Sequence, residues 1–109
     1  MHELGITQEV VELACRHAAG SRVKRIVLHI GKLSAVLPDA VRFCFDLCTE
    51  GTAAEGADLE IVEPMGLAKC RACGSALTLA RPYGQCPCGS SDLEWLAGEE
   101  LKIELVEVA

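Results

Sequence analysis

The chain has 109 residues, a length that suits one domain with a modest core and one small satellite unit. Its 10 basic and 16 acidic residues give a net charge of −6, which argues against a protein whose main work is to neutralise nucleic-acid phosphates. No apolar run approaches the ~18 residues needed to cross a bilayer and no basic secretory n-region opens the chain, so we expect a soluble, cytoplasmic protein.

The chain begins Met1-His2-Glu3, a sequence with metal-binding potential. The terminal amine, the deprotonated amide of residue 2 and the imidazole of His2 can close adjacent chelate rings around square-planar Ni(II) or Cu(II). Glu3 can add an oxygen ligand or fix the imidazole by a hydrogen bond. Taken alone the motif is weak, because an exposed, frayed chain end is the plainer interpretation of His2.

A helix followed by a strand is predicted next. Residues 6–18 repeat apolar side chains at helical spacing, with charged and amide side chains on the opposite face. Residues 22–32 are rich in β-branched residues and predict a strand, with Ile26, Leu28 and Ile30 sharing one face.

A second helix is predicted to begin near Pro38, a residue that suits a first helical turn. Its apolar face repeats at steps of three and four residues and comprises Leu37, Val41, Cys44, Phe45 and Cys48. Free cysteine is among the most buried residue types, so we expect Cys44 and Cys48, and Cys15 in the first helix, to pack rather than to bind metal.

Two further strands are predicted, one before and one after a segment of different composition. Residues 57–63 are expected to form a strand that Pro64 closes. Residues 101–108 alternate, which predicts that Leu101, Ile103 and Leu105 share one face.

The segment between these strands, residues 66–97, is rich in cysteine, glycine and proline and has too few large apolar residues for a core of its own. Because strands flank it, we interpret it as an insertion. We therefore expect an α+β fold: two helices packed on a small mixed sheet, an inserted zinc-ribbon-like domain, and a C-terminal strand that returns to the sheet. The predicted domains are residues 1–65 with 98–109, and residues 66–97.

The inserted segment holds four of the seven cysteines, in two knuckles that each end in glycine: Cys70-Arg71-Ala72-Cys73-Gly74 and Cys86-Pro87-Cys88-Gly89. An odd cysteine count without an export signal favours metal ligation over disulfides. Four thiolates brought together this way suit tetrahedral Zn²⁺, which would supply folding energy that the segment lacks. Disulfides or an iron centre remain alternatives.

The second knuckle is C-x-C, whereas a spacing of two or more residues between ligands is usual. The shorter spacing tightens the chelate loop and is expected to remove an amide-to-sulfur hydrogen bond. Residues 66–97 contain no histidine that could replace a ligand, so a site of four cysteines is still expected.

Taken together, these motifs resemble the HypA/HybF family of hydrogenase-maturation nickel metallochaperones, in the same order and over essentially the whole chain. The resemblance rests on Met1-His2-Glu3-Leu4, Ile30-Gly31-Lys32-Leu33-Ser34, Pro38-Asp39-Ala40-Val41-Arg42-Phe43 and the two cysteine knuckles. It implies a nickel-binding α/β domain with an inserted zinc domain. It also implies a non-enzymatic carrier that works with the GTPase HypB and the precursor of the hydrogenase large subunit.

Carried over by position, the resemblance implies two metal sites, a transient one for Ni(II) and a structural one for Zn(II). Their residues are Met1, His2 and Glu3 for nickel, Cys70, Cys73, Cys86 and Cys88 for zinc, and Asp39 as a group near the nickel ligands. The family's second knuckle is normally C-P-x-C, so this chain departs from the pattern by one residue there.

Other functions are weighed beside this one. A zinc-ribbon module that binds protein or nucleic acid has mild support from residues 66–97, which carry three basic and two acidic residues, but only Tyr83 and Trp95 offer aromatic rings for base stacking. An iron-binding redox protein would use the same cysteines. We expect no enzymatic activity, nucleic-acid partner or membrane partner; a homodimer is kept as an alternative to a monomer, and a urease as an alternative recipient.

Overall fold

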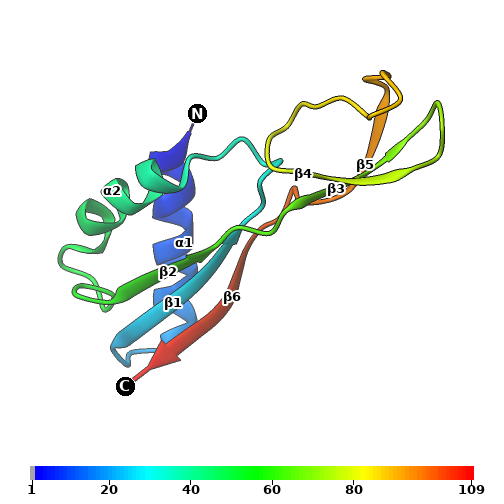
Figure 1. Cartoon of the computed structure of the whole chain (residues 1–109). Coiled ribbons are helices and arrows are strands. Elements are labelled where there is room, and N and C mark those ends of the chain that lie inside the picture. Colours follow the sequence, from blue (N-terminus) through cyan, green and yellow to red (C-terminus); the bar gives the residue numbers. More distant parts are fainter. Residues whose placement is uncertain (1) are drawn as a thin grey trace. The chain divides into compact units, whose positions relative to one another are not determined.

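The computed structural model describes residues 2–109, which form two helices and six strands arranged in two three-stranded sheets (Figure 1). The elements in chain order are α1 (Glu3–Ala18), β1 (Val23–Ile30), α2 (Pro38–Thr49), β2 (Asp58–Val62), β3 (Gly66–Cys70), β4 (Ala76–Leu79), β5 (Leu93–Ala97) and β6 (Leu101–Val108). The predicted α+β class is confirmed. No helix among the described residues has both the length and the apolar character that a membrane span requires.

The chain divides into two compact units. We call residues 2–29, 36–62 and 102–109 the helical unit, and residues 30–35 and 63–101 the cysteine unit. The assignment of nickel to the helical unit and of zinc to the cysteine unit stays a prediction.

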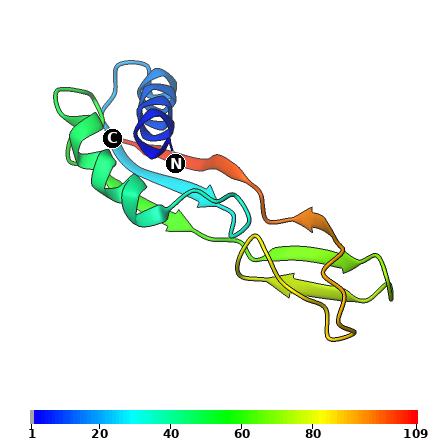
Figure 2. The same cartoon turned by 90° about the horizontal axis from the view of Figure 1, so that it is seen from above.

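The helical unit is a sheet with the order β2-β1-β6, and both helices lie on one of its faces (Figure 2). Strands β1 and β2 run parallel, with Ile26 opposite Leu59 and Leu28 opposite Ile61. The predicted inner face of β1 is confirmed, because Ile26, Leu28 and Ile30 are almost completely buried. Such a β-branched and leucine-rich strand gains stability by burying one face under the helices.

Helix α1 begins at Glu3, ahead of the start predicted at residue 6. The His2 carbonyl accepts a hydrogen bond from the Ile6 amide at 3.0 Å, and the buried Thr7 hydroxyl donates to the Glu3 carbonyl at 2.6 Å. These contacts extend the helix through residues that carry little apolar periodicity. At the other end, Ala19 adopts the left-handed conformation and stops the helix.

Helix α2 begins at Pro38 as predicted, and it buries Val41, Phe45 and Thr49. The expected place of Leu37 on the apolar face is wrong: its side chain is 59% exposed, because it precedes the helix in an extended conformation.

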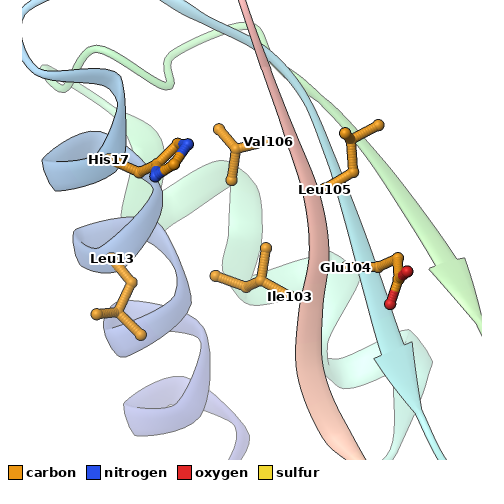
Figure 3. A pocket seen from close by; sticks show the side chains of 6 residues that line it. All are labelled: Leu13, His17, Ile103, Glu104, Leu105 and Val106. Atoms are coloured by element: carbon orange, nitrogen blue, oxygen red, sulfur yellow. The ribbon is translucent and has the colours of Figure 1, made fainter.

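The predicted common face of Leu101, Ile103 and Leu105 in β6 is also wrong. Ile103 and Val106 point towards α1, whereas Glu104 and Leu105 both point away from it (Figure 3). Inward side chains three residues apart require one extra residue in the strand, as at a β-bulge. Strict alternation in the sequence therefore fails in the middle of β6.

The cysteine unit is an antiparallel sheet with the order β4-β3-β5. Its small core consists of Leu33, Ala68 and Leu79, with Leu77 and Leu93 packed against them. Leu33 is only 3% exposed and comes from the loop after β1, outside the predicted insertion. The core of the cysteine unit therefore includes a residue that precedes the predicted insertion in the chain.

Candidate metal centres

The four predicted zinc cysteines lie together in the cysteine unit. Cys70 ends β3, Cys73 follows in the next turn, and the other two lie in the loop between β4 and β5. All four sulfurs lie within 4.8 Å of one another. The Sγ atoms of Cys70 and Cys88 are 3.7 Å apart, and those of Cys73 and Cys86 are 3.6 Å apart.

These separations fit a tetrahedral metal site. With Zn–S bonds of about 2.3 Å, the sulfurs of a tetrahedron stand about 3.8 Å apart. A disulfide bond is about 2.05 Å long, and all seven cysteines are free thiols. The donor set, four sulfurs and no oxygen, suits zinc or an iron centre rather than a hard cation.

The first knuckle closes as a turn of five residues, from Cys70 to Gly74. The Gly74 amide donates to the Cys70 carbonyl at 2.8 Å, and Gly74 has a φ of +79°, which glycine adopts without steric cost. The Cys70 sulfur accepts hydrogen bonds from two backbone amides, those of Cys73 and Ala72, and the Cys73 bond has the larger effect. Together these bonds lower the pKa of Cys70 despite its burial. The turn therefore stabilises the thiolate that a metal needs.

The second knuckle is shorter by one residue and closes one residue earlier. The Gly89 amide donates to the Cys86 carbonyl at 2.8 Å, three residues back rather than four, and Gly89 again has a positive φ of +100°. The two knuckles share a second backbone hydrogen bond. The Cys70 amide donates to the Ser75 carbonyl and the Cys86 amide donates to the Ser90 carbonyl, both at 2.9 Å. A tighter turn thus accommodates the C-x-C spacing and still presents both sulfurs.

The electrostatic environments of the sulfurs differ. Cys70 and Cys86 are buried, whereas Cys73 and Cys88 are exposed. The Ser75 hydroxyl, 3.3 Å from the Cys73 sulfur, lowers the pKa of Cys73 to about 6, and the Ser75 amide adds to this effect. For Cys86 an amide hydrogen bond from Cys88 lowers the pKa, but burial and the neighbouring thiols outweigh it and raise the pKa to about 12.

Four adjacent sulfurs do not all ionise by themselves, because like charges at this distance repel. A divalent cation removes that obstacle by displacing the protons. Ser75 was not predicted as part of the cluster. Its signal in the sequence is the Cys-Gly-Ser that ends both knuckles, at Ser75 and Ser90.

The remaining cysteines lie on the helices, apart from the cluster. Cys15, Cys44 and Cys48 are half-buried thiols. Burial, and then the neighbouring Cys44, raises the pKa of Cys48. A protonated, half-buried thiol is what a packing role requires.

At the N-terminus the structure describes two of the three predicted nickel residues, and Met1 lies outside the described residues. His2 precedes α1 with its side chain exposed. Glu3 is only 6% exposed, and its Oε2 accepts a hydrogen bond from the Leu37 amide at 3.1 Å. This bond ties the start of α1 to the residue before α2.

Asp39, which the resemblance places near the nickel ligands, is exposed in the first turn of α2.

Comparison with known proteins gives a consistent result. A family model described as "Hydrogenase/urease nickel incorporation, metallochaperone, hypA" matches residues 1–108. Hydrogenase maturation factor HypA of Nostoc sp. is 59% identical over 108 residues, covering 99% of this chain and 96% of that protein. The corresponding protein of Nostoc punctiforme is 56% identical with the same coverage.

Solved structures share the fold. The solution structure of the Ni metallochaperone HypA from Helicobacter pylori superimposes with a TM-score of 0.66 at 24% sequence identity, covering 99% of this chain and 97% of that one. At this identity the likeness supports the architecture alone.

Proposed function

Because this chain belongs to the HypA family of hydrogenase and urease nickel-incorporation metallochaperones, we propose that it binds Ni(II) at its N-terminus and helps to insert it into the large subunit of [NiFe]-hydrogenase. The relatives are named maturation factors, which supports a carrier role without catalysis. The observation that carries the proposal is the chain's start, where an exposed imidazole stands one residue after the terminal amine.

The proposed nickel ligands are the amine of Met1, the amide nitrogen and imidazole of His2, and, with them, Glu3. Since α1 begins at Glu3, the helical hydrogen-bond ladder supplies no carbonyl for the His2 amide. That nitrogen and the exposed imidazole are therefore compatible with a chelate. Nitrogen donors of this kind bind nickel and can lose it again by protonation, as a carrier requires.

Glu3 has an anchoring part in this proposal. The bond from the Leu37 amide holds its carboxylate, so the first turn of α1 is fixed next to His2. A buried carboxylate next to His2 also adds negative charge near a bound cation. Asp39, exposed in the first turn of α2, is proposed as a group near the ligands.

The cluster of four cysteines is proposed as the resident metal site, with Zn²⁺ held by Cys70, Cys73, Cys86 and Cys88. The sulfur separations support it, as does the small core of the unit, which offers little folding energy without a metal. When bound, zinc supplies structural stability and no chemistry of its own.

The proposed partners are the GTPase HypB and the precursor of the hydrogenase large subunit, in the cytoplasm. A hydrogenase is preferred to a urease as the recipient because the similar proteins are named hydrogenase maturation factors. The net charge of −6 is compatible with a basic protein surface as the docking partner.

Replacing His2 with alanine is expected to weaken nickel binding at least tenfold. Removal of a group that only hydrogen-bonds to a metal ligand typically lowers metal affinity about 10–100-fold, and removal of the ligand itself costs at least as much. Addition of three glycines before Met1 should do the same, since it moves the amine out of the chelate. The measurement is calorimetric titration of nickel into protein with an authentic N-terminus. His17→Ala removes an exposed imidazole elsewhere on α1 and serves as the matched control. Unchanged affinity in both N-terminal variants would overturn the proposal.

Glu3→Gln and Glu3→Ala separate anchoring from ligation. Glutamine keeps an oxygen that accepts the Leu37 amide, so the variant should melt close to the parent, whereas alanine should melt at a lower temperature. If Glu3 acts by anchoring, glutamine should retain nickel affinity and alanine should lose it. Loss of affinity in both variants, with the melting temperature of Glu3→Gln unchanged, would instead identify the carboxylate as a direct ligand.

A further inference from the structure

Helix α2 carries two cysteines beside its buried side. That buried side consists of Val41, Phe45 and Thr49, whereas the thiols of Cys44 and Cys48 are half-buried. Neither thiol makes a hydrogen bond within residues 2–109. Packing, the role expected for these cysteines from the sequence, therefore leaves part of each side chain accessible and neither sulfur with a hydrogen-bonding partner.

The spacing of the two cysteines brings their sulfurs to one face of the helix. Residues four apart in a helix are surface neighbours, with Cβ atoms about 5–6 Å apart. Their closeness also has an electrostatic effect: burial raises the pKa of Cys48, and the neighbouring Cys44 raises it further. A disulfide requires Cβ atoms about 3.5–4.5 Å apart, so the helix holds these side chains too widely for that bond. An ion in line between two sulfurs holds them about 4.6 Å apart, at about 2.3 Å per bond, which suits the wider spacing.

The number of donors decides which ion fits. Among residues 2–109, the only group of three or more converging histidine, cysteine, aspartate or glutamate donors is the cluster of four cysteines in the cysteine unit. The pair on α2 therefore offers two sulfurs without a third ligand of these types. A zinc site usually has four ligands. Two thiolates alone suit a soft ion with linear coordination, and thiolates select Cu(I) among the common metal ions.

We propose that Cys44 and Cys48 form a further metal site, which binds one Cu(I) ion between its two sulfurs. Binding forms two copper–sulfur bonds and releases both thiol protons to the solvent, while copper keeps its oxidation state. The raised pKa of Cys48 keeps this thiol protonated at neutral pH in the absence of an ion. Only a cation with a strong preference for sulfur displaces such protons, so the site discriminates against nickel.

The apolar surroundings of the pair fit this selectivity. Leu47 lies three residues after Cys44, and Phe43 lies four residues before Leu47, so these side chains are neighbours on the helix surface. The side chains of Phe43 and Leu47 are 72% and 57% exposed. A surface of low polarity favours a monovalent ion bound by two sulfurs over a divalent ion that would have to give up its water there.

Native mass spectrometry of the full chain loaded with zinc and titrated with Cu(I) under anaerobic conditions tests the proposal. The first product expected carries one zinc ion and one copper ion. Competition with a chromophoric Cu(I) chelator gives the affinity for copper. Cys44→Ser and Cys48→Ser should each weaken Cu(I) binding at least tenfold, because each variant leaves a single sulfur at the site.

Two control variants separate this site from other thiols. Cys15→Ser removes a half-buried thiol of α1 and should leave the Cu(I) affinity unchanged. Cys48→Ser combined with Asp46→Cys keeps two thiols on α2 but sets them two residues apart, where they do not face each other. This variant should bind Cu(I) as weakly as Cys48→Ser alone. Thermal melting of each variant verifies that it is folded.

The copper site is independent of the nickel site proposed above, so Cys44→Ser and Cys48→Ser should bind nickel as the parent does. Replacement of zinc by the first copper ion would overturn the proposal, because the copper would then occupy the four-cysteine cluster. Cu(I) affinity that neither substitution lowers, or that Cys15→Ser lowers equally, would also overturn it.

Discussion

Cys70→Ser is expected to remove the bound metal from the cysteine unit and to unfold that unit, while the helical unit keeps its structure. Cys70 is completely buried, and two backbone amides stabilise its sulfur as a thiolate. A serine hydroxyl neither ionises at neutral pH nor ligates zinc well. Without the metal, the small core of Leu33, Ala68 and Leu79, with Leu77 and Leu93 packed against it, is expected to be too small to hold the sheet together.

The measurement is metal content, with about one zinc ion per chain expected in the parent, together with the dispersion of backbone amide resonances from residues 63–101. Cys15→Ser is the matched control, because it removes a half-buried thiol outside the cluster. It should leave both the metal content and the spectrum unchanged. A Cys70→Ser protein that retains its metal and its dispersed resonances would contradict the assigned ligand set.

Gly98→Ala is expected to destabilise the cysteine unit by about 3 kcal/mol, the sum of left-handed backbone strain and overpacking. Gly98 has a φ of +108°, and a Cβ at this position would stand 2.4 Å from Cα of Gly66. The clash is with backbone, which cannot rotate away. The Gly98 carbonyl also accepts a hydrogen bond from the Leu33 amide at 2.8 Å, so movement of this residue would disturb the core.

Denaturant unfolding monitored by Trp95 fluorescence measures this change, since the tryptophan lies in β5 of the same unit. Gly89→Ala is the control, because Gly89 lies in the same unit and has a similar φ of +100° with no atom within 4 Å of the added Cβ. The control should therefore show the backbone strain without the clash. Equal losses of stability in the two variants would show that the clash at Gly98 adds nothing to the effect of backbone strain.

The sequence predicted the elements whose apolar pattern is strong and local. The β-branched run of β1 predicted the strand and its buried face, and Pro38 marked the start of α2. The cysteine knuckles predicted a cluster, because spacing and terminal glycines are local properties of the chain. These features depend on neighbouring residues alone, which is why they could be predicted without coordinates.

Features that depend on distant contacts were missed. Leu33 gave no sign that it would fill the core of the cysteine unit, because its partners Ala68 and Leu79 lie far along the chain. Likewise, nothing local shows that Glu3 binds the Leu37 amide. The failure of alternation at Leu105 is an irregularity of strand pairing, which a period of two residues cannot express.

The place of Leu33 has a consequence for biosynthesis. The cysteine unit is assembled from residues 30–35 and 63–101, so the ribosome must release the second segment before the first can take up its final contacts. Until then the nascent chain carries reduced thiols whose hydrophobic support is incomplete. Assembly of the four-cysteine cluster is thereby delayed until translation is almost finished.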